Sequence, residues 1–356
     1  MDGEARVEAR IKSDALLRLK PSDVVKDICK PKERGPLMYG KPLLLLLALS
    51  AALLATVRAA APAPVLQAET PIQVSAEPKR FDLVAVDSAK HRLIAAHSQA
   101  GTLSIVDIAT GKLEREIPVG DKPSGVAIDA ADGMYFVGTL TGVTFIDSKT
   151  LDKAAFIPTS GATDAMVYAD GKLYVGHDDG SELWVMDVKQ AKLTGSITLP
   201  GVPEIADADA HRIYQNIKDK NEVAVIDPES GKVVAEWPTP STDSPHGLAL
   251  DVTAGRLYVS GRGANVTVLS LTDGKSLPAI AIGDGRSDQS ALDAGTGRLY
   301  VPNSGKLVVI QTSDGKVLGD VPIPQGTHSV AVDPASHLVW IAYADDRASY
   351  VQAFKP

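Results

Sequence analysis

Small and apolar residues follow a pattern along this chain that returns every 40 to 42 residues. Each copy holds an apolar run that ends in Asp, then a turn, then a Leu-Tyr-Val run or its equivalent. Five copies of the first run are clear, at 83–87, 125–129, 247–251, 289–293 and 329–333. Two more copies are degenerate, at 165–169 and 205–209. A period in this range that contains only short strand-like segments is typical of a β-propeller.

Each repeat contains four segments with the alternation of a β-strand. The first is the run that ends in Asp, and the second is the Tyr-Val run, as in 134–138. The third ends in Val-Ile-Asp, as in 223–227, and the fourth follows a Gly-Lys turn, as in 317–323. Alternating apolar residues bounded by Gly, Asp, Asn and Pro indicate strands with tight turns. We therefore predict an all-β fold of four-stranded antiparallel blades.

A polar residue stands five positions before the terminal Asp of each first run, or before its equivalent. These residues are Asp82, Ser124, Asp164, Glu204, His246, Asp288 and His328. Their spacings are 42, 40, 40, 42, 42 and 40 residues. Seven copies in one unbroken register predict a seven-bladed propeller that forms a single domain over residues 65–356.

The ends of the repeat region predict how the ring closes. The seventh copy starts at His328 and leaves no residues for its fourth strand. Residues 65–75 precede the first copy and alternate as a strand does. We expect this N-terminal strand to complete the last blade, because such closure leaves no open sheet edge between the first and last blades.

The N-terminal region carries a targeting signal. Lys41-Pro42 precedes an apolar run over 43–57, and small residues follow up to Ala61. The run is shorter than the ~20 residues of a membrane span, so we interpret 38–61 as a signal peptide and expect no membrane span after cleavage. Residues 1–37 then form an over-extended N-terminus or a disordered tail; the alternative is a cytoplasmic tail on an uncleaved anchor. The signal predicts a periplasmic or secreted protein.

Charge and cysteine content limit which ligands and cross-links the repeat region can have. The chain has a formal net charge of −8. Residues 1–61 hold 11 basic and 7 acidic residues, so the remainder holds 25 basic and 37 acidic residues, a net of −12. An acidic body disfavours nucleic-acid binding, which depends on neutralising phosphates. The sole cysteine is Cys29, so the repeat region contains no disulfide and no thiolate metal site.

The repeat resembles a known family at its second strands. Residues 257–261 read Leu-Tyr-Val-Ser-Gly and residues 299–303 read Leu-Tyr-Val-Pro-Asn, which look like the YVTN repeat. With the Val-Ile-Asp runs and Gly-Lys turns, residues 65–356 resemble the YncE-like, YVTN-repeat seven-bladed propellers of bacterial envelopes. The resemblance implies a periplasmic propeller and does not fix a function, since relatives on similar propellers include lyases and haem-binding domains.

The seven polar residues are the candidate site. In a propeller they would begin the innermost strands and ring the channel mouth, where polar side chains also occur simply because the mouth is wet. His246, Asp288 and His328 come from consecutive repeats, and two imidazoles with a carboxylate suit a divalent metal. Three accessory residues come from connections on the same face: Arg262, Arg286 and His177. The arginines suit an anionic ligand, and surface ion pairs are the alternative.

Three functions follow. The first is a non-catalytic binding or scaffold protein, expected as a monomer, that takes a protein, peptide or small-molecule ligand on the funnel face. The second is a metal-assisted lyase or hydrolase that uses His246, Asp288 and His328; streptogramin lyase is similar in outline, but Ser290 departs from its pattern. The third, single-stranded DNA binding, comes from the family and is opposed by the acidic body. The sequence contains no cofactor-attachment motif. Free histidines could ligate haem, but their spacing does not select it, and a divalent metal is the cofactor that the ring residues suit.

Overall fold

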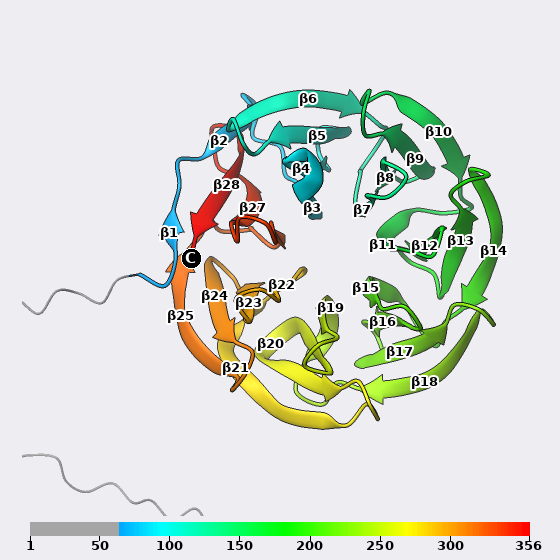
Figure 1. Cartoon of the computed structure of the whole chain (residues 1–356), viewed down its shortest axis with the longest axis vertical. Coiled ribbons are helices and arrows are strands. Elements are labelled where there is room, and N and C mark those ends of the chain that lie inside the picture. The colour runs from blue at the N-terminus through cyan, green and yellow to red at the C-terminus, as the bar shows by residue number, and fades with distance from the viewer. Residues whose placement is uncertain (1–63) are drawn as a thin grey trace, which may run out of the picture. The chain divides into compact units, whose positions relative to one another are not determined.

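The computed structural model describes residues 64–356, which form seven β-sheets arranged as blades around a central channel (Figure 1). The predicted all-β, seven-bladed propeller is confirmed. Within this range the one helical element is the short turn η1 (Ser88–Lys90), and no helix has the length and apolar character needed to cross a membrane. The predicted signal peptide and the segment 1–37 lie outside the described residues.

The blades are numbered 1 to 7 in chain order, and in each the innermost strand comes first. Blades 1 and 2 contain β3 (Val84–Asp87), β4 (Arg92–His97), β5 (Thr102–Asp107) and β6 (Lys112–Pro118), then β7 (Val126–Asp129), β8 (Met134–Gly138), β9 (Gly142–Asp147) and β10 (Lys153–Pro158). Blades 3 and 4 contain β11 (Thr163–Ala169), β12 (Lys172–His177), β13 (Glu182–Asp187) and β14 (Lys192–Thr198), then β15 (Pro203–Ala208), β16 (Ile213–Ile217), β17 (Glu222–Asp227) and β18 (Lys232–Pro238). Blades 5 and 6 contain β19 (Asp243–Asp251), β20 (Arg256–Ser270) and β21 (Ser276–Arg286), then β22 (Ala291–Asp293), β23 (Arg298–Pro302), β24 (Lys306–Gln311) and β25 (Lys316–Pro322).

Blade 5 departs from the others because its two middle strands merge. The first part of β20 pairs with β19, as Leu248 does with Val259, and its second part pairs with β21, as Val266 does with Ile280. The blade thus keeps four strand positions while β20 continues through the connection between them. Near that connection, Arg262 of β20 is the register partner of Arg286 of β21.

Blade 7 is closed by the N-terminal segment, as predicted. It contains β26 (Val330–Val332), β27 (Val339–Ala344) and β28 (Ser349–Lys355), and β28 pairs antiparallel with β1 (Gln67–Ala68) and β2 (Ile72–Ser75). The closing segment is two short strands rather than one, interrupted at Pro71. In Figure 1 both strands lie on the outer side of β28, so the two ends of the domain are joined in one sheet.

The Asp that ends the innermost strand forms hydrogen bonds within its own turn and to a neighbouring blade. Asp87 accepts a hydrogen bond from the backbone N–H of Lys90 in its own turn and from the Tyr135 hydroxyl in blade 2, at 2.8 Å for the latter. Asp293 likewise lies 2.9 Å from His337 Nδ1 of blade 7. A buried carboxylate with such partners is stabilised rather than penalised, so the most regular polar position of the repeat is structural.

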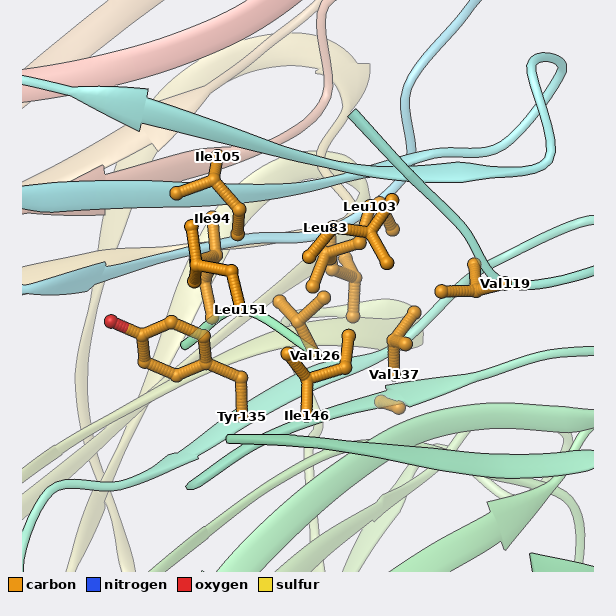
Figure 2. Packing of buried hydrophobic residues seen from close by; sticks show 13 residues of the cluster. Leu83, Ile94, Leu103, Ile105, Val119, Val126, Tyr135, Val137, Ile146 and Leu151 are labelled. Atoms are coloured by element: carbon orange, nitrogen blue, oxygen red, sulfur yellow. The ribbon is translucent and has the colours of Figure 1, made fainter. Parts of the chain in front are cut away.

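The core lies between neighbouring blades. Figure 2 shows the cluster between blades 1 and 2, where Leu83 and Ile94 of blade 1 pack near Val126, Tyr135 and Ile146 of blade 2. Equivalent clusters of buried residues stand at the other blade interfaces. Because each sheet buries apolar side chains against the next, the blades hold a fixed angle and the residues at their inner ends are placed around one axis.

Candidate ligand-binding site at the channel mouth

The seven polar residues identified from the repeat line a single cavity of about 330 Å³. The structure therefore brings together residues from all seven blades that are separated by up to 246 positions, from 82 to 328. Arg262 and Arg286 line the same cavity, and so do three further charged residues, Lys122, Asp178 and Lys218. Five carboxylates, four Lys or Arg side chains and two imidazoles face one space, so the site is almost wholly polar.

Hydrogen bonds between blades fix the backbone of this ring. The Ser124 carbonyl accepts from the Leu83 N–H of blade 1, at 3.3 Å, and the His328 carbonyl accepts from the Gln289 N–H of blade 6, at 3.0 Å. The Asn216 side chain of blade 4 donates to the His246 carbonyl at 2.9 Å. The side chains of the ring therefore project from a rigid frame that is set before any ligand arrives.

Gly125 allows the backbones of blades 2 and 3 to approach closely beside the ring. A Cβ atom added to Gly125 would stand 2.2 Å from the Asp164 carbonyl oxygen of the next blade, a distance that real Cβ atoms do not adopt. Ser124, beside it, is buried and donates its hydroxyl to the Thr163 carbonyl at 2.8 Å. Ser124 thus serves the scaffold, and the glycine that follows it in the repeat is needed for packing between blades.

Three carboxylates of blades 1, 3 and 4, namely Asp82, Asp164 and Glu204, form what we call the acidic floor. Asp82 and Asp164 are half-buried and lack a hydrogen-bond partner for their carboxylates among residues 64–356. Burial, followed by repulsion from Asp288 and Glu204, raises the pKa of Asp82 to about 6, although His328 opposes the shift. Burial and the neighbouring carboxylates also raise the pKa of Asp164 well above its ordinary value.

Glu204 differs from these two because it has partners. Lys218 donates to Glu204 Oε1 at 2.6 Å, and His246 Nε2 lies 3.6 Å from the same oxygen. On the other side of the imidazole, His246 Nδ1 lies 2.5 Å from the Ser244 carbonyl. A carbonyl can only accept, so Nδ1 carries a hydrogen, and Nε2 is the ring nitrogen that lies near Glu204.

Three cationic side chains, Lys122, Arg262 and Arg286, form what we call the basic rim, and all three residues are exposed. Lys122 donates to Asp178 at 3.1 Å, and Arg286 contacts both oxygens of Asp288, at 3.2 and 3.3 Å. Arg262 has no ion-pair partner within the described part of the chain. The charged residues are therefore sorted by depth, with the carboxylates less exposed than the cations.

The two histidines of the predicted metal site have separate carboxylate partners. His328 Nδ1 lies 3.5 Å from Asp288, whereas His246 lies beside Glu204. Over residues 64–356 the structure contains no group of three or more His, Cys, Asp or Glu side chains placed to hold a metal ion together. The metal site therefore stays a prediction.

His177, an accessory residue from the sequence, does not line the cavity. Its ring stacks on Trp184 with centroids 4.5 Å apart, and Nδ1 lies 3.5 Å from Glu182. Lys122 also lines the cavity and is not among the candidates from the sequence. A signal was present, since Lys122 stands two positions before Ser124, as Arg286 stands two positions before Asp288.

The channel continues past the ring as a second cavity of about 370 Å³, lined by the innermost strands. Asp207 is the charged residue in that lining, and burial raises its pKa to about 6. The Gln289 side chain crosses between blades here: it donates to the Val84 carbonyl at 2.9 Å and accepts from the Val330 N–H at 3.2 Å. Gln289 thus links blade 6 to the two blades that meet at the closure.

Comparison with known proteins agrees with this architecture. Residues 169–342 match the model of a family described as outer membrane protein assembly factor BamB. No curated protein matches the sequence. A solved structure of hydrazine synthase from Kuenenia stuttgartiensis is 14% identical, covering 82% of this chain and 98% of that chain, with a TM-score of 0.67. The structure of U3-55K is 10% identical, covering 80% and 97%, with a TM-score of 0.71.

These likenesses differ in what they support. The two solved structures share the fold alone, because their identities to this chain are low. The family match covers just under half of the chain, from the end of β11 in blade 3 to β27 in blade 7. The finer resemblance to YncE-like, YVTN-repeat proteins stays a prediction from the sequence.

Proposed function

We propose that this protein is a non-catalytic binding propeller whose binding site is the cavity at the channel mouth. The observation that carries the proposal is that Asp82 and Asp164 line this cavity as half-buried carboxylates that accept no hydrogen bond from residues 64–356. Buried polar groups are normally paired, so unpaired carboxylates on a rigid ring favour a ligand that supplies the partner. A polar, preformed cavity of this size suits a small molecule or one residue of a peptide.

The test is a thermal-shift screen of small polar molecules against the mature protein. Asp164→Arg would place a long cation in the cavity beside Glu204 and Asp82, and it should abolish the shift for every compound that binds there. Asp132→Arg makes the same charge change in an exposed turn of blade 2 and should leave the shifts intact. Compounds whose effect survives Asp164→Arg and falls with Asp132→Arg would contradict the proposed location.

We also propose that the protein works in the periplasm or at the outer membrane. The charged, apolar and small-residue order over 38–61 supports export, and the family that matches residues 169–342 is described as an outer membrane assembly factor. Cell fractionation followed by N-terminal sequencing tests this. Recovery in the cytoplasm, or a mature chain that begins before Leu43, would refute it.

An enzyme is the second candidate, and the two His–carboxylate pairs favour it. His246 with Glu204 and His328 with Asp288 could each act as a general base in a lyase or hydrolase. Metal assistance would require the side chains of the two pairs to converge. Replacing both His246 and His328 with Asn would abolish turnover while the fold persists. A substrate that binds but is not turned over by the wild-type protein would favour the binding role.

A further inference from the structure

We infer that the cavity at the channel mouth selects an extended zwitterion: a small molecule, such as an ω-amino acid or short peptide, with an ammonium at one end and a carboxylate at the other. The inference rests on the proposed binding function and names its ligand class. Two independent observations carry it, one for each end of the ligand.

The acidic floor provides the site for the ammonium. Asp82 and Asp164 flank blade 2 and face the cavity without partners in the described part of the protein. Glu204, the third carboxylate of the floor, adds acceptor oxygens in the same cavity. An ammonium has three donors and no acceptor, so acceptors spread around it satisfy it without the tight cluster of oxygens that a metal ion needs.

The basic rim provides the site for the carboxylate. Arg262 of β20 is directly paired with Arg286 of β21 and, on its other side, with Asp243 of β19. Like charges in paired positions destabilise a sheet, and Asp243 forms no ion pair with Arg262 in the described residues. Asp288 compensates Arg286, whereas Arg262 has no ion-pair partner among residues 64–356. A carboxylate seated between the two guanidinium groups would relieve the repulsion and accept hydrogen bonds in the fork geometry that arginine favours.

The position of the blades sets the length of the ligand. Asp82 and Asp164 of the floor belong to blades 1 and 3, on either side of blade 2, and the two arginines of the rim belong to blade 5. Lys122, the third residue of the rim, lies near blade 2 and is paired with Asp178. In Figure 1, blades 2 and 5 (β7–β10 and β19–β21) lie on nearly opposite sides of the ring. The two charges of the ligand are therefore separated across the channel mouth. This favours a molecule with a spacer over a compact α-amino acid such as glycine.

Isothermal titration of the mature protein with a homologous series tests the inference. Glycine, aminobutanoate, aminohexanoate and aminooctanoate, with the amine on the terminal carbon, change only the charge separation. Diaminohexane and adipate have the same six carbons in all as aminohexanoate and replace one charge type with the other. We expect affinity to rise from glycine to the longer ω-amino acids, and aminohexanoate to bind at least about tenfold more tightly than either matched compound.

Two variants assign the ends of the ligand. Asp82→Asn should weaken aminohexanoate and diaminohexane by about tenfold while sparing adipate, and Arg262→Ala should weaken aminohexanoate and adipate while sparing diaminohexane. Thermal melts of both variants check that the fold persists. No heat from any ω-amino acid, or equal affinity across chain lengths, would overturn the inference.

The same experiment separates the ligand class from the binding function. If diaminohexane or adipate binds as tightly as aminohexanoate and Asp164→Arg abolishes that binding, the zwitterion class is wrong while the cavity remains a binding site. If Asp164→Arg leaves the affinities of all the compounds unchanged, binding occurs elsewhere and the proposed function fails as well. Weaker binding in Asp132→Arg would also place the site away from the channel mouth.

Discussion

Replacing Asp82 with Asn should stabilise the ligand-free protein at neutral pH. Burial raises the pKa of Asp82 from its ordinary 3.8 to about 6, with repulsion from Asp288 and Glu204 adding to the effect and His328 opposing it. Between these two pKa values the folded protein binds more protons than the unfolded chain. The free energy of unfolding therefore falls as pH rises through this window. Asparagine has a similar shape and cannot ionise, so it removes the penalty.

The size of the effect follows from the shift. A difference of about 2 pKa units corresponds to about 3 kcal/mol at neutral pH, at 1.36 kcal/mol per unit. Water reaches the half-buried carboxylate, so we expect about 1 to 3 kcal/mol, or an increase in Tm of about 2 to 6 °C. Near pH 4 the folded carboxyl is already protonated, and the gain from Asp82→Asn should be close to zero.

Urea unfolding followed by tryptophan fluorescence at about pH 4, 6 and 7.5 measures the effect. Asp147→Asn supplies a control of opposite sign: backbone hydrogen bonds from Thr150 and Lys149 lower the pKa of Asp147, so neutralising it should reduce stability at neutral pH. A loss of stability in Asp82→Asn near pH 7.5, or the same gain at every pH, would show that desolvation of this carboxylate is not what sets its pKa.

Two further predictions concern closure of the ring. Leu66, which is 2% exposed, packs in the cluster between blades 6 and 7; Leu66→Ala should cost about 2 to 5 kcal/mol in urea unfolding, whereas Val252→Ala at an exposed turn should change little. Gln289→Ala removes the bonds to Val84 and Val330 and should cost about 1 to 3 kcal/mol. Wild-type stability in Leu66→Ala would refute the closure role of the N-terminal segment, and an unchanged midpoint in Gln289→Ala would refute its bridging role.

The sequence predicts the fold well because every level of the repeat agrees with it. The period, the alternation and the Gly-Lys turns all require the same four-stranded unit. One polar position recurs once in each unit, so counting its copies gives the number of blades. Details that break the repeat were not predicted. The closing strand divides at Pro71, a residue that cannot donate to a sheet, and β20 continues through a connection that the other blades break.

The repeat predicts that the seven polar residues meet at the channel mouth, and it does not predict which side chains pair with them. Equivalent positions of a closed repeat must meet at the axis, so one offset located Asp82, His246 and the rest of the ring. Pairing depends on loops that the repeat does not constrain. Lys122 reaches Asp178 of the next blade, and Lys218 lies beside Glu204. Such contacts arise from side-chain reach between loops of different blades, which has no signature in spacing.

The acidic floor is difficult to explain as a merely wet channel mouth. Ser124 shows how the ring satisfies a polar residue within the scaffold, by donating to the Thr163 carbonyl. Asp82 and Asp164 have no such bond in the described structure, and their raised pKa values mean that their charges oppose folding at neutral pH. A bound ammonium would supply the missing partner and remove that opposition, and so would stabilise the wild-type protein more than Asp82→Asn. The substitution should therefore raise the stability of the free protein and lower its affinity, two consequences of one unpaired carboxylate.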